Sequence, residues 1–138
     1  PSLSVRERGW SQPRRLVATR TMNVDELASV MPAGPAPEAV SASGRAEWLK
    51  ILSKLGREGV TALLVEGGGE LAAEMLTAGV VDKIEFHMAP VIMGGRNSRP
   101  AIGGKGPASL ADAMRLSDIR ISRAGSDIIV SGYPEAKR

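Results

Sequence analysis

Three consecutive glycines form the part of this sequence best suited to bind a charged ligand. Gly67, Gly68 and Gly69 follow the apolar segment 61–65 and precede a helix predicted over residues 70–78. The free N–H groups and the dipole of a helix N-terminus favour a phosphate, and glycines remove the Cβ atoms that would hold it away. A turn after a parallel strand also lies at the edge where open α/β sheets bind ligands. We therefore expect a phosphate to contact this turn.

The same turn has a structural interpretation, because glycines at a tight connection also supply positive φ angles. The spacing Gly67-x-Gly69-x-x-Ala72 matches the dinucleotide fingerprint, although this pattern alone is weakly specific. A Rossmann fold would place an acidic residue at the end of the next strand, whereas Glu85 falls in the middle of it. The pattern thus favours dinucleotide binding on another fold. Glu66 is either a solvated carboxylate or an acceptor for substrate hydroxyls.

Residues 94–106 form a second candidate segment, with two Gly-Gly pairs and the cations Arg96, Arg99 and Lys105. It is either a phosphate loop or, as we expect, a mobile surface loop near the mouth of the active site. The segment does not match a Walker A motif, because glycine rather than Ser or Thr follows Lys105.

Composition narrows the class of protein. The chain has 138 residues, 43% hydrophobic and 24% charged, which is typical of one globular domain. It has no cysteine, so disulfides and thiolate metal sites are excluded and a reducing cytoplasm is expected. His87 is the only histidine, so we predict no metal site and interpret it as a packed or hydrogen-bonded residue rather than a catalyst. Neither a secretory signal nor a membrane-spanning run is found.

The chain is basic, with a net charge of +3 and a pI near 9.7. Aromatic residues make up only 3% of the chain, so few side chains could stack on bases. The cations are also scattered along the sequence. This pattern disfavours an RNA-binding domain and fits smaller anions such as phosphates.

The predicted elements alternate in type. Asn23 is a candidate N-cap, and Gly59 and Gly79 are candidate helix ends. Strands and helices alternate through most of the chain, and two strands close it, which predicts an α/β sandwich with parallel strands in the middle and an antiparallel C-terminal hairpin. The predicted strands are residues 15–19, 38–42, 61–65, 83–91, 116–123 and 127–131, and the helices are residues 24–30, 45–57 and 70–78.

Residues 63–72, 79–83 and 89–95 together resemble the C-terminal reductase domain of the bifunctional riboflavin-biosynthesis deaminase–reductase. Residues 1–6 are similar to the family segment that follows two aspartates, and the resemblance covers essentially the whole chain. It implies a dihydrofolate-reductase-like fold, a three-layer α/β sandwich with a mostly parallel sheet. It also implies NADPH-dependent reduction of 5-amino-6-(5-phosphoribosylamino)uracil to the ribitylamino product, in a cytoplasmic homodimer that binds neither nucleic acid nor membrane.

The family pattern implies roles for particular positions. Substrate contacts are implied at Leu3, Arg6 and Glu66, with Arg6 suited to the ribose 5-phosphate. No catalytic residue is assigned. Cofactor contacts are implied at the turn and the helix that follows it: Gly68, Gly69, Glu70, Leu71, Ala72, Ala73 and Glu74.

Two departures from the family pattern bear on function. Arg20 stands where relatives carry a small polar residue, and it either pairs with the 2′-phosphate of NADPH or faces solvent. The chain begins at Pro1, after the family's first strand, turn and helix, so we expect residues 1–138 to be a single, N-terminally truncated reductase domain with an incomplete nicotinamide side. Two alternatives stay open: a related reductase for another pteridine- or pyrimidine-like substrate, and a non-catalytic nucleotide-binding or dimerisation fragment.

Overall fold

The computed structural model describes residues 3, 5, 9–31 and 34–135, and it divides the chain into two compact units. The first unit is Pro1–Ser43 and the second is Gly44–Arg138. Within the described residues, no helix combines the length and the apolar character needed to cross a bilayer. Arg6 lies outside the described residues.

The first unit is a small βαβ arrangement of β1 (Leu16–Ala18), α1 (Val24–Val30) and β2 (Glu38–Val40). The two strands pair in parallel with Leu16 opposite Glu38, as the alternating pattern predicts. Asn23 and Glu26 close a capping box at the start of α1: the Glu26 N–H donates to the Asn23 side chain at 2.9 Å, and the Asn23 N–H donates to the Glu26 carboxylate at 2.8 Å. The predicted bounds of this helix are confirmed.

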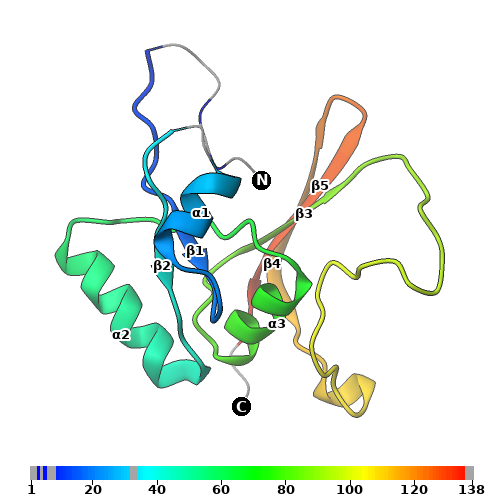
Figure 1. The fold of residues 1–138 in the computed structure, drawn as a ribbon. Helices are drawn as coiled ribbons and strands as arrows, with labels where there is room; N and C mark the ends of the chain where they lie inside the picture. Colours follow the sequence, from blue (N-terminus) through cyan, green and yellow to red (C-terminus); the bar gives the residue numbers. More distant parts are fainter. Residues whose placement is uncertain (1–2, 4, 6–8, 32–33, 136–138) are drawn as a thin grey trace. The chain divides into compact units, whose positions relative to one another are not determined.

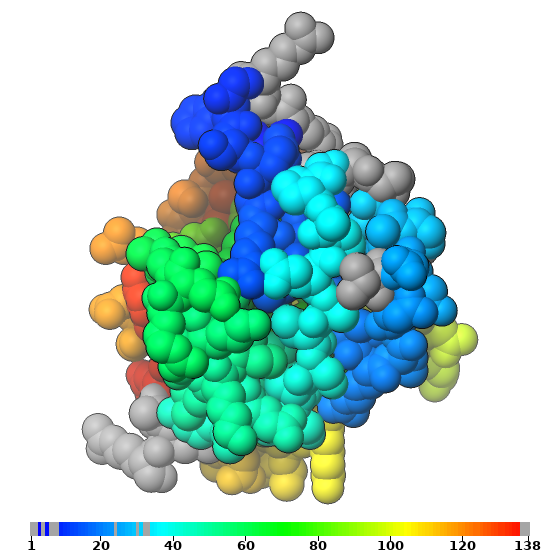
Figure 2. All heavy atoms as spheres, turned by 60° about the vertical axis from the view of Figure 1, so that its left-hand side comes forward, coloured from blue at the N-terminus to red at the C-terminus, as the bar shows by residue number. Residues whose placement is uncertain are grey.

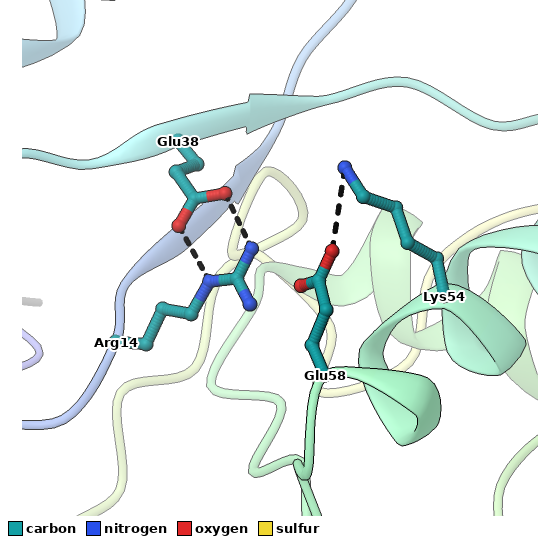
Figure 3. Close-up of polar contacts among 4 residues, drawn as sticks. All are labelled: Arg14, Glu38, Lys54 and Glu58. Atoms are coloured by element: carbon teal, nitrogen blue, oxygen red, sulfur yellow. Dashed lines mark hydrogen bonds and ion pairs between the residues drawn. The ribbon is translucent and has the colours of Figure 1, made fainter.

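Two arginines tie β1 to the rest of this unit. Arg15 is only 2% exposed, and its Nε donates to the Pro35 carbonyl at 2.8 Å. Arg14 forms a two-point ion pair with Glu38 at 2.5 and 2.7 Å, which links the segment before β1 to the first residue of β2 (Figure 3). The strand begins at Leu16 and ends at Ala18, shorter than the predicted 15–19.

The second unit contains two helices and a separate sheet. The helices are α2 (Gly44–Arg57) and α3 (Gly69–Thr77), each within a residue of its predicted bounds. The sheet has β3 (Ile84–Met88), β4 (Leu116–Ala124) and β5 (Asp127–Pro134) in the order β3-β5-β4, all antiparallel (Figure 1). The predicted C-terminal hairpin is therefore confirmed. A short 3₁₀ helix, η1 (Leu110–Asp112), was not predicted.

Helices α2 and α3 pack beside each other, and their surfaces lie in contact in the space-filling view (Figure 2). Trp48 and Leu55 of α2 and Met75 of α3 are buried. The guanidinium of Arg45 donates to the Ala78 carbonyl at 2.8 Å, so α2 also caps the C-terminal end of α3. On the surface of α2, Lys54 lies 3.8 Å from Glu58 (Figure 3).

Both helices end in the same glycine motif, as predicted. After α2, Gly59 has a φ of 86°, and the Val60 N–H donates to the Leu55 carbonyl at 3.0 Å. After α3, Gly79 has a φ of 63°, and the Val80 N–H donates to the Met75 carbonyl at 3.3 Å. This is the Schellman arrangement, in which a left-handed residue lets the chain satisfy the last carbonyls of a helix.

Other predicted strands also differ in the structure: β2 ends at Val40 rather than at residue 42, one strand is absent and one is shortened. Residues 61–65 do not form a strand, and Leu64 is 79% exposed rather than covered on both faces. A buried parallel strand needs neighbours that accept its backbone hydrogen bonds. Among the described residues, none makes a backbone–backbone hydrogen bond to residues 61–67. The strand predicted over 83–91 is only Ile84–Met88, because Pro90 lacks an N–H and Val91 turns back to donate to Ala89 at 2.8 Å.

Candidate functional site

The glycine turn begins α3. Gly68 is the N-cap residue, with a φ of −66° and a ψ of 169°, and α3 runs from Gly69. None of Gly67, Gly68 and Gly69 has a positive φ. The structural interpretation of the turn, that glycine supplies left-handed angles, is therefore wrong. The atoms that surround each Cβ position differ among the three glycines.

Close packing inside the chain explains two of the three glycines. A Cβ at Gly67 would lie 2.5 Å from Cδ2 of Leu71. A Cβ at Gly69 would lie 2.7 Å from the Pro100 carbonyl oxygen and 2.9 Å from the Gly103 nitrogen. Contacts this short do not occur for real side chains. A side chain at position 67 would require the Leu71 side chain to move, whereas one at position 69 would require the backbone of the loop to shift.

Gly68 is different. It is exposed, and a Cβ there would meet nothing within 4 Å. Neither its backbone angles nor its neighbours require glycine. The open space lies at the N-terminus of a helix whose first N–H groups have no acceptor within the helix. The geometry therefore fits a phosphate that approaches the backbone where a side chain would otherwise stand.

The residues predicted to bind the cofactor differ in what they can offer. The N–H groups of Gly69, Glu70 and Leu71 belong to the first turn, where no helical acceptor exists. The Ala72 N–H instead donates to the Gly68 carbonyl at 3.1 Å, so this amide is used inside the helix. Ala73 and Glu74 are half-buried in the following turn. Within the helix, the first three residues thus have N–H groups available to a ligand, whereas that of Ala72 is already bonded.

A loop far along the sequence packs against this turn. The sequence predicted a loop over residues 94–106 near the mouth of the active site, but not its contacts with the turn. The Gly103 N–H donates to the Gly69 carbonyl at 2.9 Å, and the Gly104 N–H donates to Oε1 of Glu70 at 3.1 Å. The loop belongs to residues 89–109, which run as a long arc from β3 to η1 (Figure 1). The Gly103-Gly104 pair is the sequence signal at the contact itself, and Gly104 has a φ of 70° in the structure.

The remaining predicted site residues are Glu66, directly before the turn, and Leu3 and Arg20, far from it in the sequence. Glu66 is exposed in the irregular segment before the glycines. Leu3 is half-buried with a φ of 48°, an uncommon angle for a residue with a side chain. Arg20 is exposed and follows β1, which ends at Ala18 rather than at Arg20. Leu3 and Arg20 belong to the first unit, and their roles stay predictions.

The exposed face of β3 carries a charged row that has no part in the predicted site. Nζ of Lys83 lies 2.7 Å from Glu85, and its hydrogen bond and positive charge lower the pKa of the Glu85 carboxyl. The same hydrogen bond and the negative charge of Glu85 raise the pKa of Lys83. Nε2 of His87 lies 3.9 Å from Glu85, and the His87 side chain is 59% exposed. We predicted that His87 is packed or hydrogen-bonded. The first alternative is wrong, since the side chain points to the solvent face of the strand, and the imidazole instead lies beside the Glu85 carboxylate.

These features are those of an α/β protein in which a helix begins at an open glycine turn. Comparison with known proteins is more specific. The sequence model of the family described as RibD C-terminal domain matches residues 1–130. The chain belongs to this family.

Several characterised relatives are reductases by name. The 2,5-diamino-6-ribosylamino-4(3H)-pyrimidinone 5′-phosphate reductase of Methanothermobacter thermautotrophicus is 38% identical over 91 residues, which cover 66% of this chain and 42% of that protein. The reductase of the same name from Aquifex aeolicus is 30% identical over 84% of this chain and 62% of its own length. The riboflavin biosynthesis protein RibD of Bacillus amyloliquefaciens is 26% identical over 98% of this chain and 43% of its own length. The chain therefore spans between two fifths and two thirds of these relatives.

Solved structures agree on the fold. Acinetobacter baumannii RibD, form 2, superposes with a TM-score of 0.73 at 16% identity, covering 98% of this chain and 43% of that one. Form 1 of the same protein gives a TM-score of 0.68. The predicted dihydrofolate-reductase-like α/β class is confirmed by this likeness, together with the parallel pairing of β1 with β2 and the antiparallel pairing of β3, β4 and β5.

Proposed function

We propose that residues 1–138 make up one reductase domain of a cytoplasmic riboflavin-biosynthesis enzyme, and that the domain uses NADPH to reduce the ribose of 5-amino-6-(5-phosphoribosylamino)uracil. Membership of the family supports the reaction class. The observation that carries the assignment to a cofactor turn is Gly68, whose Cβ position is open and whose backbone angles would suit any residue.

In this proposal, the residues of the chain bind and orient the two ligands. The first-turn N–H groups of Gly69, Glu70 and Leu71 donate to the diphosphate of the dinucleotide. Arg6 pairs with the 5-phosphate of the substrate, and Glu66 accepts hydrogen bonds from the sugar hydroxyls. When bound, NADPH would supply the hydride that reduces C1′ of the ribosylamino group.

The proposed specificity for NADPH over NADH depends on Arg20. A guanidinium at the cofactor's ribose would pair with the 2′-phosphate that NADH lacks. Arg20→Ala should then narrow the difference in dissociation constant between NADPH and NADH. A solvent-facing Arg20 would leave that difference unchanged.

Oxidation of NADPH in the presence of the pyrimidine substrate tests the reaction. Turnover that depends on both ligands supports a reductase. Protection against thermal unfolding by NADPH, without turnover, supports the alternative of a non-catalytic nucleotide-binding fragment. Absence of both effects would refute cofactor binding by this chain.

A second substrate deserves the same assay. The relatives from Methanothermobacter and Aquifex are named for a 2,5-diamino-6-ribosylamino-4(3H)-pyrimidinone 5′-phosphate, and they are more similar to this chain than the Bacillus RibD is. The two pyrimidines differ on the base and share the phosphoribosyl group. A comparison of kcat/KM for the two pyrimidines would identify which base the protein prefers. Residues that bind the shared ribose phosphate cannot distinguish the two substrates.

We propose a homodimer as the working assembly. The edge strand β4 supports this proposal, because it has unpaired backbone groups along one side and exposes Ile119 and Ile121. Light scattering at several protein concentrations would measure the oligomeric state. Charged substitutions at Ile121 should then favour the monomer.

A further inference from the structure

Glu70 has a role that its position in the cofactor turn does not suggest. It is the second residue of α3, and a carboxylate there lies close to any phosphate bound by the first turn. Its negative charge would repel that phosphate. In the structure, however, Oε1 of Glu70 accepts a 3.1 Å hydrogen bond from the N–H of Gly104, which lies 34 residues away in sequence.

This contact is one part of a closely packed joint between the loop and the helix. The Gly103 N–H donates to the Gly69 carbonyl at 2.9 Å. A Cβ at Gly104 would lie 2.8 Å from Cβ of Ala73, and a Cβ at Gly103 would collide with the Glu70 carboxylate. Glycines on both sides thus let the loop backbone lie directly on the first turns of α3.

Two cations flank the joint. Arg99 precedes Pro100, whose carbonyl oxygen lies against Gly69, and Lys105 follows Gly104. Both side chains are exposed, and neither makes an ion pair with another residue in the described parts of the chain. Two cations therefore stand next in sequence to the loop residues that contact this helix end, where an anion is already favoured.

We propose that Glu70 is a positioning residue: it fixes the loop 99–105 on the first turn of α3, so that Arg99 and Lys105 complete the site for the dinucleotide phosphates. The inference rests on the proposed function, because the anion is the cofactor named there. It assigns to Arg99 and Lys105 a contact with phosphate. It assigns to the Glu70 side chain an action through the loop, distinct from the contact proposed for the Glu70 main-chain N–H.

Two variants of Glu70 separate positioning from charge. Glu70→Gln keeps an oxygen that accepts from Gly104 and removes the negative charge, whereas Glu70→Ala removes both. If Glu70 positions the loop, the dissociation constant of NADPH for the full chain should rise about threefold to tenfold in Glu70→Ala and should not rise in Glu70→Gln. If only the charge matters, both variants should bind NADPH more tightly, and the inference is refuted.

The cations are tested by Lys105→Ala and Arg99→Ala, with Arg96→Ala as the matched control. Arg96 is an exposed cation of the same long loop, but it lies outside the 99–105 joint. Each test variant should weaken NADPH binding about twofold to fivefold at low salt, with a smaller effect at high salt, and the control should not. Equal effects of all three substitutions would refute a specific contact. They would indicate that the net charge of the protein alone affects NADPH binding.

The result also separates this inference from the proposed function. If wild-type protein binds NADPH and Gly68→Asp weakens it, while Glu70→Ala and Lys105→Ala leave the dissociation constant unchanged, the cofactor turn stands and the loop has no role. If the wild type does not bind NADPH, both proposals fail. Thermal unfolding of every variant, measured without ligand, shows whether a lost affinity follows from a lost fold.

Discussion

The N–H of Gly103 donates a 2.9 Å hydrogen bond to the carbonyl of Gly69, the first residue of α3. The contact leaves no room for a side chain at Gly69, since a Cβ there would lie 2.7 Å from the Pro100 oxygen. A loop of the same unit therefore packs against Gly69, whereas the Cβ position of the neighbouring Gly68 is open. Two adjacent glycines therefore have separate roles, and substitution can distinguish them.

Gly69→Ala should destabilise the second unit, because the new methyl group must displace the backbone of the loop. Overpacking of this kind costs about 1–3 kcal/mol of unfolding free energy. Gly68→Ala is the matched control: its methyl group meets nothing within 4 Å, so it should change stability by no more than about 0.5 kcal/mol. Urea unfolding monitored by tryptophan fluorescence would measure both. Similar values for the two variants would contradict the packing described for Gly69.

Gly68→Asp should have opposite effects on stability and on binding. Aspartate is a better N-cap than glycine, so the free energy of unfolding should rise by a few tenths of a kcal/mol. The carboxylate would occupy the open space and repel a phosphate, so the affinity for NADPH should fall at least tenfold. Calorimetric titration with NADPH checks the second effect. Unchanged affinity in a folded variant would remove the glycine turn from the cofactor site.

Gly56 and Gly59 form a matched pair at the end of α2. Both have open space around the Cβ position, but Gly59 has a φ of 86° and Gly56 lies inside the helix with an ordinary angle. Gly59→Ala should cost about 1 kcal/mol, because a side chain disfavours the left-handed region. Gly56→Ala should add about 0.5–1 kcal/mol, because alanine loses less entropy in a helix. Thermal unfolding of both variants should shift the midpoint in opposite directions.

The Lys83–Glu85 pair should make a small, pH-dependent contribution to stability. The pKa of Glu85 is lowered, so its contribution is present above the ordinary value of 4.5 and is lost as the pH falls through the lowered pKa. The pKa of Lys83 is raised, so its contribution is present below 10.5 and is lost as the pH rises through the raised pKa. Lys83→Met should return the Glu85 pKa towards 4.5, as measured by carboxyl NMR titration. An unchanged titration would show that the pair does not form in solution.

Arg6→Ala should raise KM for the substrate far more than KM for NADPH. A guanidinium that pairs with the ribose 5-phosphate contributes to binding of one ligand only, and its loss should raise the substrate KM by roughly tenfold to a hundredfold. Arg6→Lys is a suitable comparison, since an ammonium keeps the charge but not the two-point geometry. Equal increases for both ligands would remove the phosphate role.

Local features of this chain were predictable because their causes lie within a few residues. Asn23 and Glu26 define the start of α1, and Gly59 and Gly79 define the ends of α2 and α3, through bonds between neighbouring positions. The closing hairpin follows from two alternating strands separated by a short turn that contains Gly125. Family membership was also available from the sequence, since the glycine turn and the segment after it are contiguous.

Only the tertiary structure shows which segments that are distant in the sequence pair or form hydrogen bonds with one another. Apolar character at residues 61–65 indicates that a strand is possible, but a strand forms only where another backbone accepts its hydrogen bonds. Likewise, the sequence shows that Glu70 begins a helix, yet not that its carboxylate holds Gly104, which lies 34 residues away in an irregular loop. The spacing of apolar residues along a helix or strand indicates which of its faces is buried. An irregular loop has no such spacing, so the segment that it contacts is known only from the folded structure.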